Sequence, residues 1–317
     1  MANKKRQAIF SLALTLALAI LAGLYAKNHW AEFKTLLATP IWLGQWVAIF
    51  ASMLLTLVIN SELLRTGVRV MGVPLGFKEG LALAMSTMGA NYFIPLKGGA
   101  GLRAYYLKAR WKMPFTDFIA QLFAISVVAL AVGSFLAFWG LWFMAGTEAT
   151  KPLLGYFGGT FILGLASIMF LGRIPLTDKV PRLAALARGW DVFRANPKVS
   201  LWLALLQVAY YLVLALVNRL CFEAFGVSLG WGQALFYSAV QLHSTIINLT
   251  PAGLGVVEAF GVLAGQVLNF TPAVALLAQG LYRLSQLTLL ILIGLWGWRF
   301  LARGKTLNSV TIDGEKA

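Results

Sequence analysis

Two short stretches of the chain decide the fold. Residues 91–103 are NYFIPLKGGAGLR, and residues 248–258 are NLTPAGLGVVE. In both, an asparagine precedes a proline, glycines follow, and a charged residue stands seven or eight positions after the proline. Each stretch lies in a longer apolar segment, where helix-breaking residues are tolerated only if the backbone is buried in protein or lines a wet cavity. The residues that we expect to form the two turns are Pro95, Gly98, Gly99, Gly101, Pro251, Gly253 and Gly255.

The composition is that of a membrane protein. Of the 317 residues, 60% are hydrophobic and 12% are charged, and the mean hydropathy is +0.79. A soluble domain carries about 25% charged residues, so this chain has too few charges to cover a water-facing surface. The composition therefore excludes a soluble globular enzyme and a disordered protein. It predicts an all-α polytopic membrane protein.

Six uninterrupted apolar runs are long enough to cross about 30 Å of hydrocarbon. The first, residues 8–24, is longer than the roughly 7–15-residue core of a signal peptide. No A-x-A cleavage site follows it, so we expect an uncleaved span. The other five predicted spans are Ile41–Asn60, Phe118–Phe143, Leu153–Leu171, Leu201–Phe222 and Ala273–Trp296.

The distribution of charge predicts the orientation. The chain has 26 Lys and Arg against 11 Asp and Glu, a net charge of +15. The basic residues stand in clusters between apolar runs, so the positive-inside rule explains them better than binding to nucleic acid. Outside the spans, the only basic residues in external loops are Lys27, Lys34 and Lys151. This pattern predicts a prokaryotic plasma (inner) membrane protein with cytoplasmic N- and C-termini.

The two interrupted segments, residues 80–101 and 232–268, are expected not to cross the membrane. Basic clusters flank the first on both sides, whereas the flanks of the second hold almost no charge. Each segment should therefore enter and leave on one side, as a re-entrant hairpin, the first from inside and the second from outside. Each half of the chain then contains two spans, a hairpin and a span in that order, with opposite orientations. Such inverted repeats are typical of secondary transporters.

This pattern also gives the domain organisation. Residues 1–150 are expected to form the first membrane repeat, and residues 151–300 the second, inverted one. A cytoplasmic segment, residues 173–198, should connect spans within the second repeat, as a surface helix or a plain loop. Residues 301–317 should form a cytoplasmic tail.

The second turn motif, with Leu281-Tyr282-Arg283 in the following helix, resembles the flippase-like membrane domain family. That family includes the transmembrane region of lysylphosphatidylglycerol synthases. Residues 91–108 are similar to its other signature region, and the resemblance runs from about Leu37 to Trp298. It implies movement of an amphiphilic lipid between leaflets. Because no soluble catalytic domain follows Phe300, the chain resembles the stand-alone members, and aminoacyl transfer is not implied.

Ionisable residues inside the membrane are candidate functional residues, because inserting them is costly. Arg283 lies about eleven residues into the last span and shares a helix face with Gln279 and Gln286. It could bind a substrate, or it could pair with Glu258 to hold the fold. Glu258 could cap its helix, pair with Arg283 or Arg103, or act as a protonatable coupling group.

Other polar residues surround the two turns. Arg103 and Lys97 flank the first glycine cluster, where they could bind a lipid phosphate or follow the positive-inside rule. Gln241 lies on a polar stripe of its helix, which could line a wet cavity or bond to neighbouring helices. The complete set expected to bind or translocate the substrate is Arg103, Lys97, Glu258, Arg283, Gln279, Gln286, Asn91, Asn248 and Gln241.

No motif predicts an enzyme. The chain lacks a G-x-x-x-x-G-K-[ST] loop, an H-E-x-x-H pair and a G-x-S-x-G elbow. With two histidines and one cysteine, it predicts no catalytic residues, no metal site and no cofactor. The favoured function is a lipid flippase. The alternatives are an intramembrane transferase acting on a lipid or polyprenyl phosphate, and a membrane scaffold for a separate lipid-modifying enzyme. The sequence does not predict an oligomeric state.

Overall fold

The structure of the chain is a computed structural model that describes residues 2–93, 98–144, 150–170, 190–245, 250 and 253–313. Throughout these ranges the regular secondary structure is helical, without a strand. The helices are α1 (Ala2–Asn28), α2 (Trp30–Leu37), α3 (Leu43–Arg69), α4 (Phe77–Phe93), α5 (Gly98–Trp111), α6 (Phe115–Trp142), α7 (Thr150–Phe170), α9 (Pro197–Glu223), α10 (Trp231–Ser244), α11 (Val256–Val267) and α12 (Pro272–Asp313).

Among the described helices, α3, α6, α7, α9 and α12 are long and apolar enough to cross a membrane. Together they cover nearly all of five of the six predicted spans, and each extends past at least one end of its span. Helix α3 continues nine residues past Asn60 to Arg69, and α12 continues through most of the predicted tail. The first predicted span lies in α1, whose part Ala13–Asn28 is a shorter apolar helix. Helix α2, between the first two predicted spans, was not predicted.

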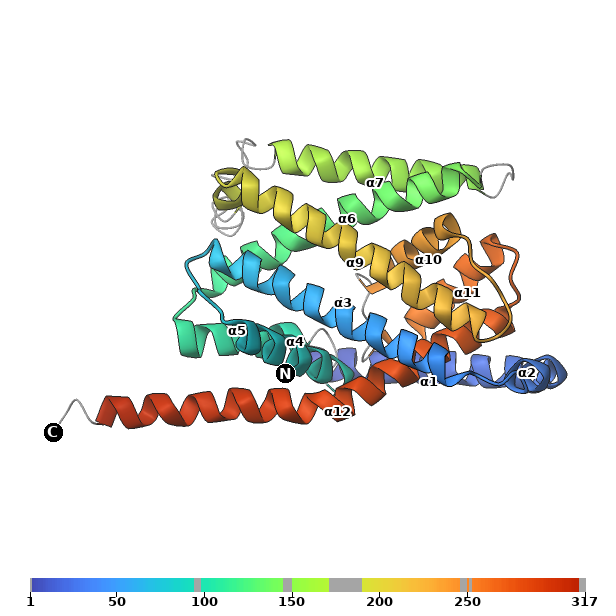
Figure 1. The fold of residues 1–317 in the computed structure, drawn as a ribbon, viewed down its shortest axis with the longest axis horizontal. Coiled ribbons are helices and arrows are strands. Elements are labelled where there is room, and N and C mark those ends of the chain that lie inside the picture. Colours follow the sequence, from blue (N-terminus) through green and yellow to red (C-terminus); the bar gives the residue numbers. More distant parts are fainter. Residues whose placement is uncertain are drawn as a thin grey trace.

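Each interrupted segment forms two helices that pack against each other. The first forms α4 and α5, and the second forms α10 and α11. In Figure 1 the α4–α5 pair joins α3 and α6 at the left end of the bundle, whereas the α10–α11 pair joins α9 and α12 at the right end. The predicted turn residues Pro95 and Pro251, together with Lys97 and Asn248, lie outside the described residues. So does most of the connecting segment, of which residues 190–194 are helical.

The packing of the two halves follows one pattern. Helices α3 and α9 lie side by side at the centre of the bundle (Figure 1). Helix α4 packs on α3 and α12, and in the same way α10 packs on α9 and α6. Helix α12 contacts both α3 and α9, and so does α6. The arms α4 and α10 therefore each contact a span of their own half and the last span of the other half.

Local sequence recurs where the chain enters each hairpin. Residues 72–77 are GVPLGF and precede α4, and residues 226–231 are GVSLGW and precede α10. The first glycine of each has a left-handed backbone, with φ of +83° at Gly72 and +77° at Gly226, a conformation that glycine adopts without steric cost. The chain also leaves the two helix pairs in the same way. The described non-glycine residues with positive φ are Lys112, which precedes α6, and Asn269, which precedes α12.

A close helix contact holds the second hairpin against the first half of the chain. Gly140 of α6 lies against Gly232 of α10, and a Cβ atom added to Gly140 would lie 2.5 Å from the Gly232 carbonyl oxygen. That oxygen belongs to the helix backbone, so it cannot move aside as a flexible side chain could. The approach of α6 to α10 therefore depends on these two small residues.

We expect Gly140→Ala to lower the free energy of unfolding by about 1–3 kcal/mol, the usual cost of overpacking a core. The matched control is Gly155→Ala on α7, where an added Cβ meets no atom within 4 Å and alanine favours the helix. Thermal unfolding in detergent measures both variants. Equal stability of the two would contradict the close approach of α6 and α10.

Candidate functional site

A cavity of about 430 Å³ lies between the two helix pairs in the bundle. Helices α4 and α5 line it from one side, α10 and α11 from the other, and α3, α6, α9 and α12 complete the wall. Its polar and ionisable lining residues are Thr56, Asn60, Thr87, Asn91, Tyr92, Arg103, Ser126, Tyr210, Gln241, Thr245, Tyr282, Arg283 and Gln286. The interrupted segments thus bring polar groups from distant parts of the sequence into one space.

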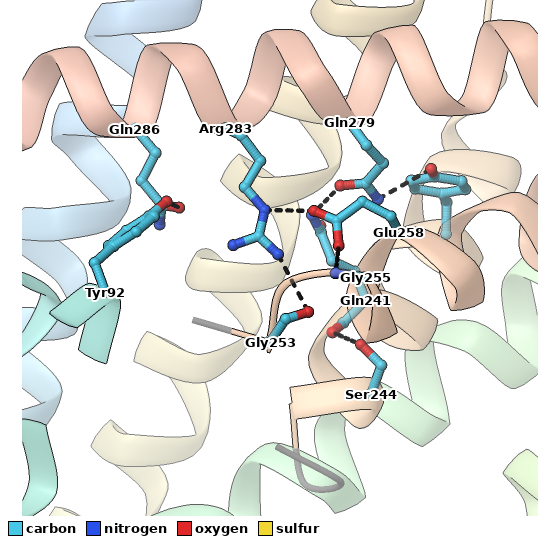
Figure 2. Close-up of polar contacts among 10 residues, drawn as sticks. Tyr92, Gln241, Ser244, Gly253, Gly255, Glu258, Gln279, Arg283 and Gln286 are labelled. Atoms are coloured by element: carbon cyan, nitrogen blue, oxygen red, sulfur yellow. Dashed lines mark hydrogen bonds and ion pairs between the residues drawn. The ribbon is translucent and has the colours of Figure 1, made fainter. Parts of the chain in front are cut away.

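Arg283 projects from α12 toward the second helix pair (Figure 2). Its Nε donates a hydrogen bond to Glu258 Oε1 at 2.6 Å, and a terminal nitrogen lies 3.5 Å from the Gly253 carbonyl oxygen. The two charged side chains are 13% and 20% exposed, so water screens their attraction only partly. This ion pair fastens α11 and the segment before it to α12.

Glu258 has a second role at the start of α11. Its other oxygen, Oε2, accepts a hydrogen bond from the backbone N–H of Gly255 at 2.7 Å. Gly255 has φ of +80° and precedes the first residue of the helix. The carboxylate thus satisfies a free backbone donor and also lies at the positive end of the helix dipole. The sequence left capping and ion pairing as alternatives for Glu258. Both occur, because Oε2 caps the helix and Oε1 pairs with Arg283.

Three amide side chains form a network behind the cavity. Gln241 donates to Gln279 at 3.3 Å, and Gln279 donates to the Tyr237 hydroxyl at 3.0 Å. Asn218 of α9 donates to Gln241 at 3.2 Å. Gln279 is 1% exposed and does not line the cavity, whereas Gln241 belongs both to the network and to the cavity wall. Most of the side chains in this network therefore join α9, α10 and α12 to one another and do not face the cavity.

Within the described residues, the first helix pair supplies a cation without an acidic partner. Arg103 of α5 is partly buried and lines the cavity. Its Nε lies 3.5 Å from the Thr87 hydroxyl, and none of the ion pairs in the described part of the chain includes it. Asn91, also in the wall, accepts a hydrogen bond from the Gly99 N–H at 2.9 Å, which ties the end of α4 to the start of α5. Gly98, Gly99 and Gly101 lie in the first turn of α5.

The sequence analysis did not include eight polar residues of the wall, and two of them, Tyr92 and Asn60, had a signal in the sequence. The Tyr92 hydroxyl donates to Gln286 Oε1 at 2.5 Å and so connects α4 to α12 (Figure 2). The sequence signal for Tyr92 was its position next to the predicted site residue Asn91. Asn60, placed at the end of a predicted span, lies inside α3 and lines the cavity. The sequence signal for Asn60 was an amide side chain within an apolar run.

The arrangement suits an anion. Two guanidinium groups line the cavity, and the carboxylate that contacts one of them neutralises only that one. No group of three His, Cys, Asp or Glu side chains able to hold a metal ion occurs in the described ranges. Guanidinium groups bind phosphate and carboxylate oxygens through a planar fork. The two guanidinium groups of the cavity wall are therefore suited to a phosphate-bearing group.

Comparison with known proteins identifies the family. The family described as Lysylphosphatidylglycerol synthase TM region matches residues 9–294, and the chain belongs to this family. The match includes both helix pairs and the cavity between them. No curated protein shows significant similarity to the chain. The chain is thus a multi-pass membrane protein of a family connected with membrane lipids.

The Glu258–Arg283 pair predicts a specific pattern of stability. Glu258→Gln and Arg283→Gln should each lower the free energy of unfolding by about 3–5 kcal/mol, because each leaves a poorly solvated charge without a partner. Glutamine at position 258 can still cap α11, so loss of the cap does not explain the effect. The double variant leaves no unpaired charge and should recover most of the loss.

Thermal unfolding of the four proteins in detergent gives the coupling energy. A double variant whose loss equals the sum of the two single losses would show that the side chains act independently.

Proposed function

We propose that the protein is a lipid translocator that moves an amphiphilic, anionic or phosphate-bearing lipid between the leaflets of a prokaryotic plasma membrane. The observation that carries the proposal is the cavity between the two helix pairs, lined by Arg103 and Arg283. Membership of a family connected with membrane lipids supports a lipid as the substrate. The headgroup would cross through the cavity while the acyl chains stay in the hydrocarbon.

The proposed architecture has six spans, with α1 as the first, and two re-entrant hairpins in an inverted repeat. Exchanging α3 with α9, α4 with α10 and α6 with α12 reproduces the packing of α4 on α3 and α12 as that of α10 on α9 and α6, whereas the extensive packing of α6 on α7 has no counterpart of similar extent among the described helices. The recurrence of GVPLGF and GVSLGW before the two pairs supports the same relation. The attachment of the two helix pairs to opposite ends of the bundle also supports an inverted repeat (Figure 1). The proposed termini are cytoplasmic, because the basic segments then face inside.

The mechanism follows from the cost of moving a charge through lipid. A charged group at the bilayer centre costs at least about 2.5–3.5 kcal/mol. A cavity with fixed cations and hydroxyl groups replaces the water that the headgroup loses. Because the two hairpins would enter from opposite sides, a displacement of either one would open the cavity to its own side of the membrane. This is the alternating access expected of inverted repeats.

Contacts at the base of the first hairpin support its movement as one unit. Tyr106, Arg110 and Trp111 of α5 all donate hydrogen bonds to one oxygen of Glu79 on α4, at 2.6, 3.0 and 3.0 Å. These bonds hold the two arms together. In the second hairpin the Glu258–Arg283 pair instead ties α11 to α12, a neighbouring span. The two hairpins would therefore differ in how freely they move.

The other two functions have less support. A transferase acting on a lipid or polyprenyl phosphate would need a general base at the cavity, and the carboxylate of Glu258 is engaged by Arg283 and by the Gly255 N–H. A scaffold for a separate lipid-modifying enzyme would not need a cationic cavity within the bundle.

The test is leaflet exchange of a labelled anionic lipid in proteoliposomes. Arg103→Gln should slow exchange at least about tenfold, because a hydrogen bond to a charged group contributes about 1.5–3 kcal/mol. The matched control is Arg219→Gln, since Arg219 lies outside the cavity wall and pairs with Glu223 at 3.6 Å. It should exchange lipid at the wild-type rate. No exchange by the wild-type protein, or equal exchange by the two variants, would contradict the proposal.

A further inference from the structure

A second cavity of about 580 Å³ lies among α6, α7 and α9, and it shares none of its described lining residues with the cavity between the helix pairs. Helices α7 and α9 both pack on α6 but make no extensive contact with each other in the described ranges. Helix α7 lies at the edge of the bundle (Figure 1). The cavity is therefore a groove between two spans. Its wall includes Val128 and Phe135 of α6, Phe161 and Leu165 of α7, and Leu203 and Val208 of α9.

The wall of the groove offers little to water. The indole N–H of Trp190 donates to the Ile168 carbonyl oxygen at 3.4 Å, and the Ser200 hydroxyl donates to the Phe193 carbonyl oxygen at 2.8 Å. The other polar side chain among the described lining residues is that of Arg194. A buried water needs two to four polar partners, and protein interiors leave few voids larger than a water molecule. The groove therefore suits an apolar occupant.

The length of the groove matches one leaflet of a bilayer. Along α9 it runs from Pro197, the first residue of the helix, to Val208, eleven residues later and close to the middle of the span. With a rise of about 1.5 Å per residue this is about 16 Å, roughly half of the 30 Å hydrocarbon thickness. Along α7 it runs from Ile168, near the end of that helix, to Phe161 at its middle. A chain in the groove would thus extend from the membrane surface to the midplane.

Arg194 lies at the surface end of the groove, three residues before α9 begins. Its Nη1 lies 3.6 Å from Asp191 Oδ1, and the side chains are 30% and 55% exposed. That distance is too long for a hydrogen bond, and an exposed ion pair contributes little to stability. The guanidinium can therefore donate to a phosphate at the membrane surface. An apolar groove one leaflet deep with a guanidinium at its mouth has the dimensions and polarity of a phospholipid.

We infer that the groove between α6, α7 and α9 binds a resident phospholipid, with one acyl chain along α9 and the phosphate beside Arg194. An acyl chain gains no hydrophobic energy by leaving other lipid chains. It is held instead by packing against walls that would otherwise face a void, and by a charge-assisted hydrogen bond to the phosphate. The lipid becomes part of the contact between α7 and α9. Because this groove is separate from the translocation cavity, the inference does not depend on the proposed function.

The experiment places the protein in phosphatidylcholine vesicles that contain increasing mole fractions of a phosphatidylcholine with a diazirine midway along one acyl chain. After irradiation, peptide mass spectrometry locates the labelled residues. Labelling of Phe161 and Val208 in the groove should saturate at a low mole fraction, because a resident lipid occupies a single site. Labelling of Leu163, an exposed residue of α7 outside the groove wall, should rise in proportion to the probe.

A pair of neighbouring substitutions tests the position of the chain. Ala204→Phe places a phenyl ring in the groove wall and should abolish the saturable labelling of Phe161 and Val208. The matched control is Leu205→Phe, because Leu205 is exposed and lies outside the groove wall. It should be labelled like the wild-type protein. Proportional labelling at every site of the wild-type protein, or unchanged saturation in Ala204→Phe, would overturn the inference.

The headgroup end is tested separately. Arg194→Gln should raise the mole fraction for half-saturation at least about tenfold, because it removes a hydrogen bond from a charged group. Arg219→Gln should leave it unchanged, since Arg219 lies outside the groove wall. An equal value for the two variants would overturn the placement of the phosphate. A diazirine fatty acid tests the other source of an acyl chain, and saturable labelling by it alone would overturn the assignment to a phospholipid.

Discussion

The structure depends on one constraint, which is that an interrupted helix at membrane depth must find partners for its free backbone groups inside the protein. In each helix pair a side chain supplies one such partner. Asn91 accepts from the Gly99 N–H in the first pair, and Glu258 accepts from the Gly255 N–H in the second. These bonds, and the packing of α4 and α10 on the central helices, make room for a polar cavity in an apolar bundle.

The two halves share an arrangement of helices but not of charge. The second pair caps its helix with a carboxylate, and that carboxylate also neutralises Arg283. The first pair uses the neutral amide of Asn91 instead, so Arg103 keeps its charge. A carboxylate beside Arg103, like the one beside Arg283, would have neutralised it. The difference between Asn91 and Glu258 therefore accounts for the affinity for an anion that we propose.

Much of the fold could be predicted from the sequence because long apolar runs and helix breakers are local signals. Five spans and the two interruptions were predicted on that basis. The inward stripe of α12 followed from helical spacing, and Arg283 and Gln286 do line the cavity. Other features depend on tertiary packing. The bond from Tyr92 to Gln286 joins residues 194 positions apart, and spacing along the chain did not reveal that Gln279 lies behind the wall rather than in it.

The central claim is that the two hairpins enter from opposite sides of the membrane and meet at one cationic cavity. Its most direct test uses single cysteines at Pro74 and Ser228, two exposed and equivalent positions in the recurring motif, with the buried Cys221 replaced by alanine. The account predicts that Ser228→Cys reacts with an impermeant thiol reagent in intact cells, and that Pro74→Cys reacts only after permeabilisation. Reaction of both from the same side would contradict it.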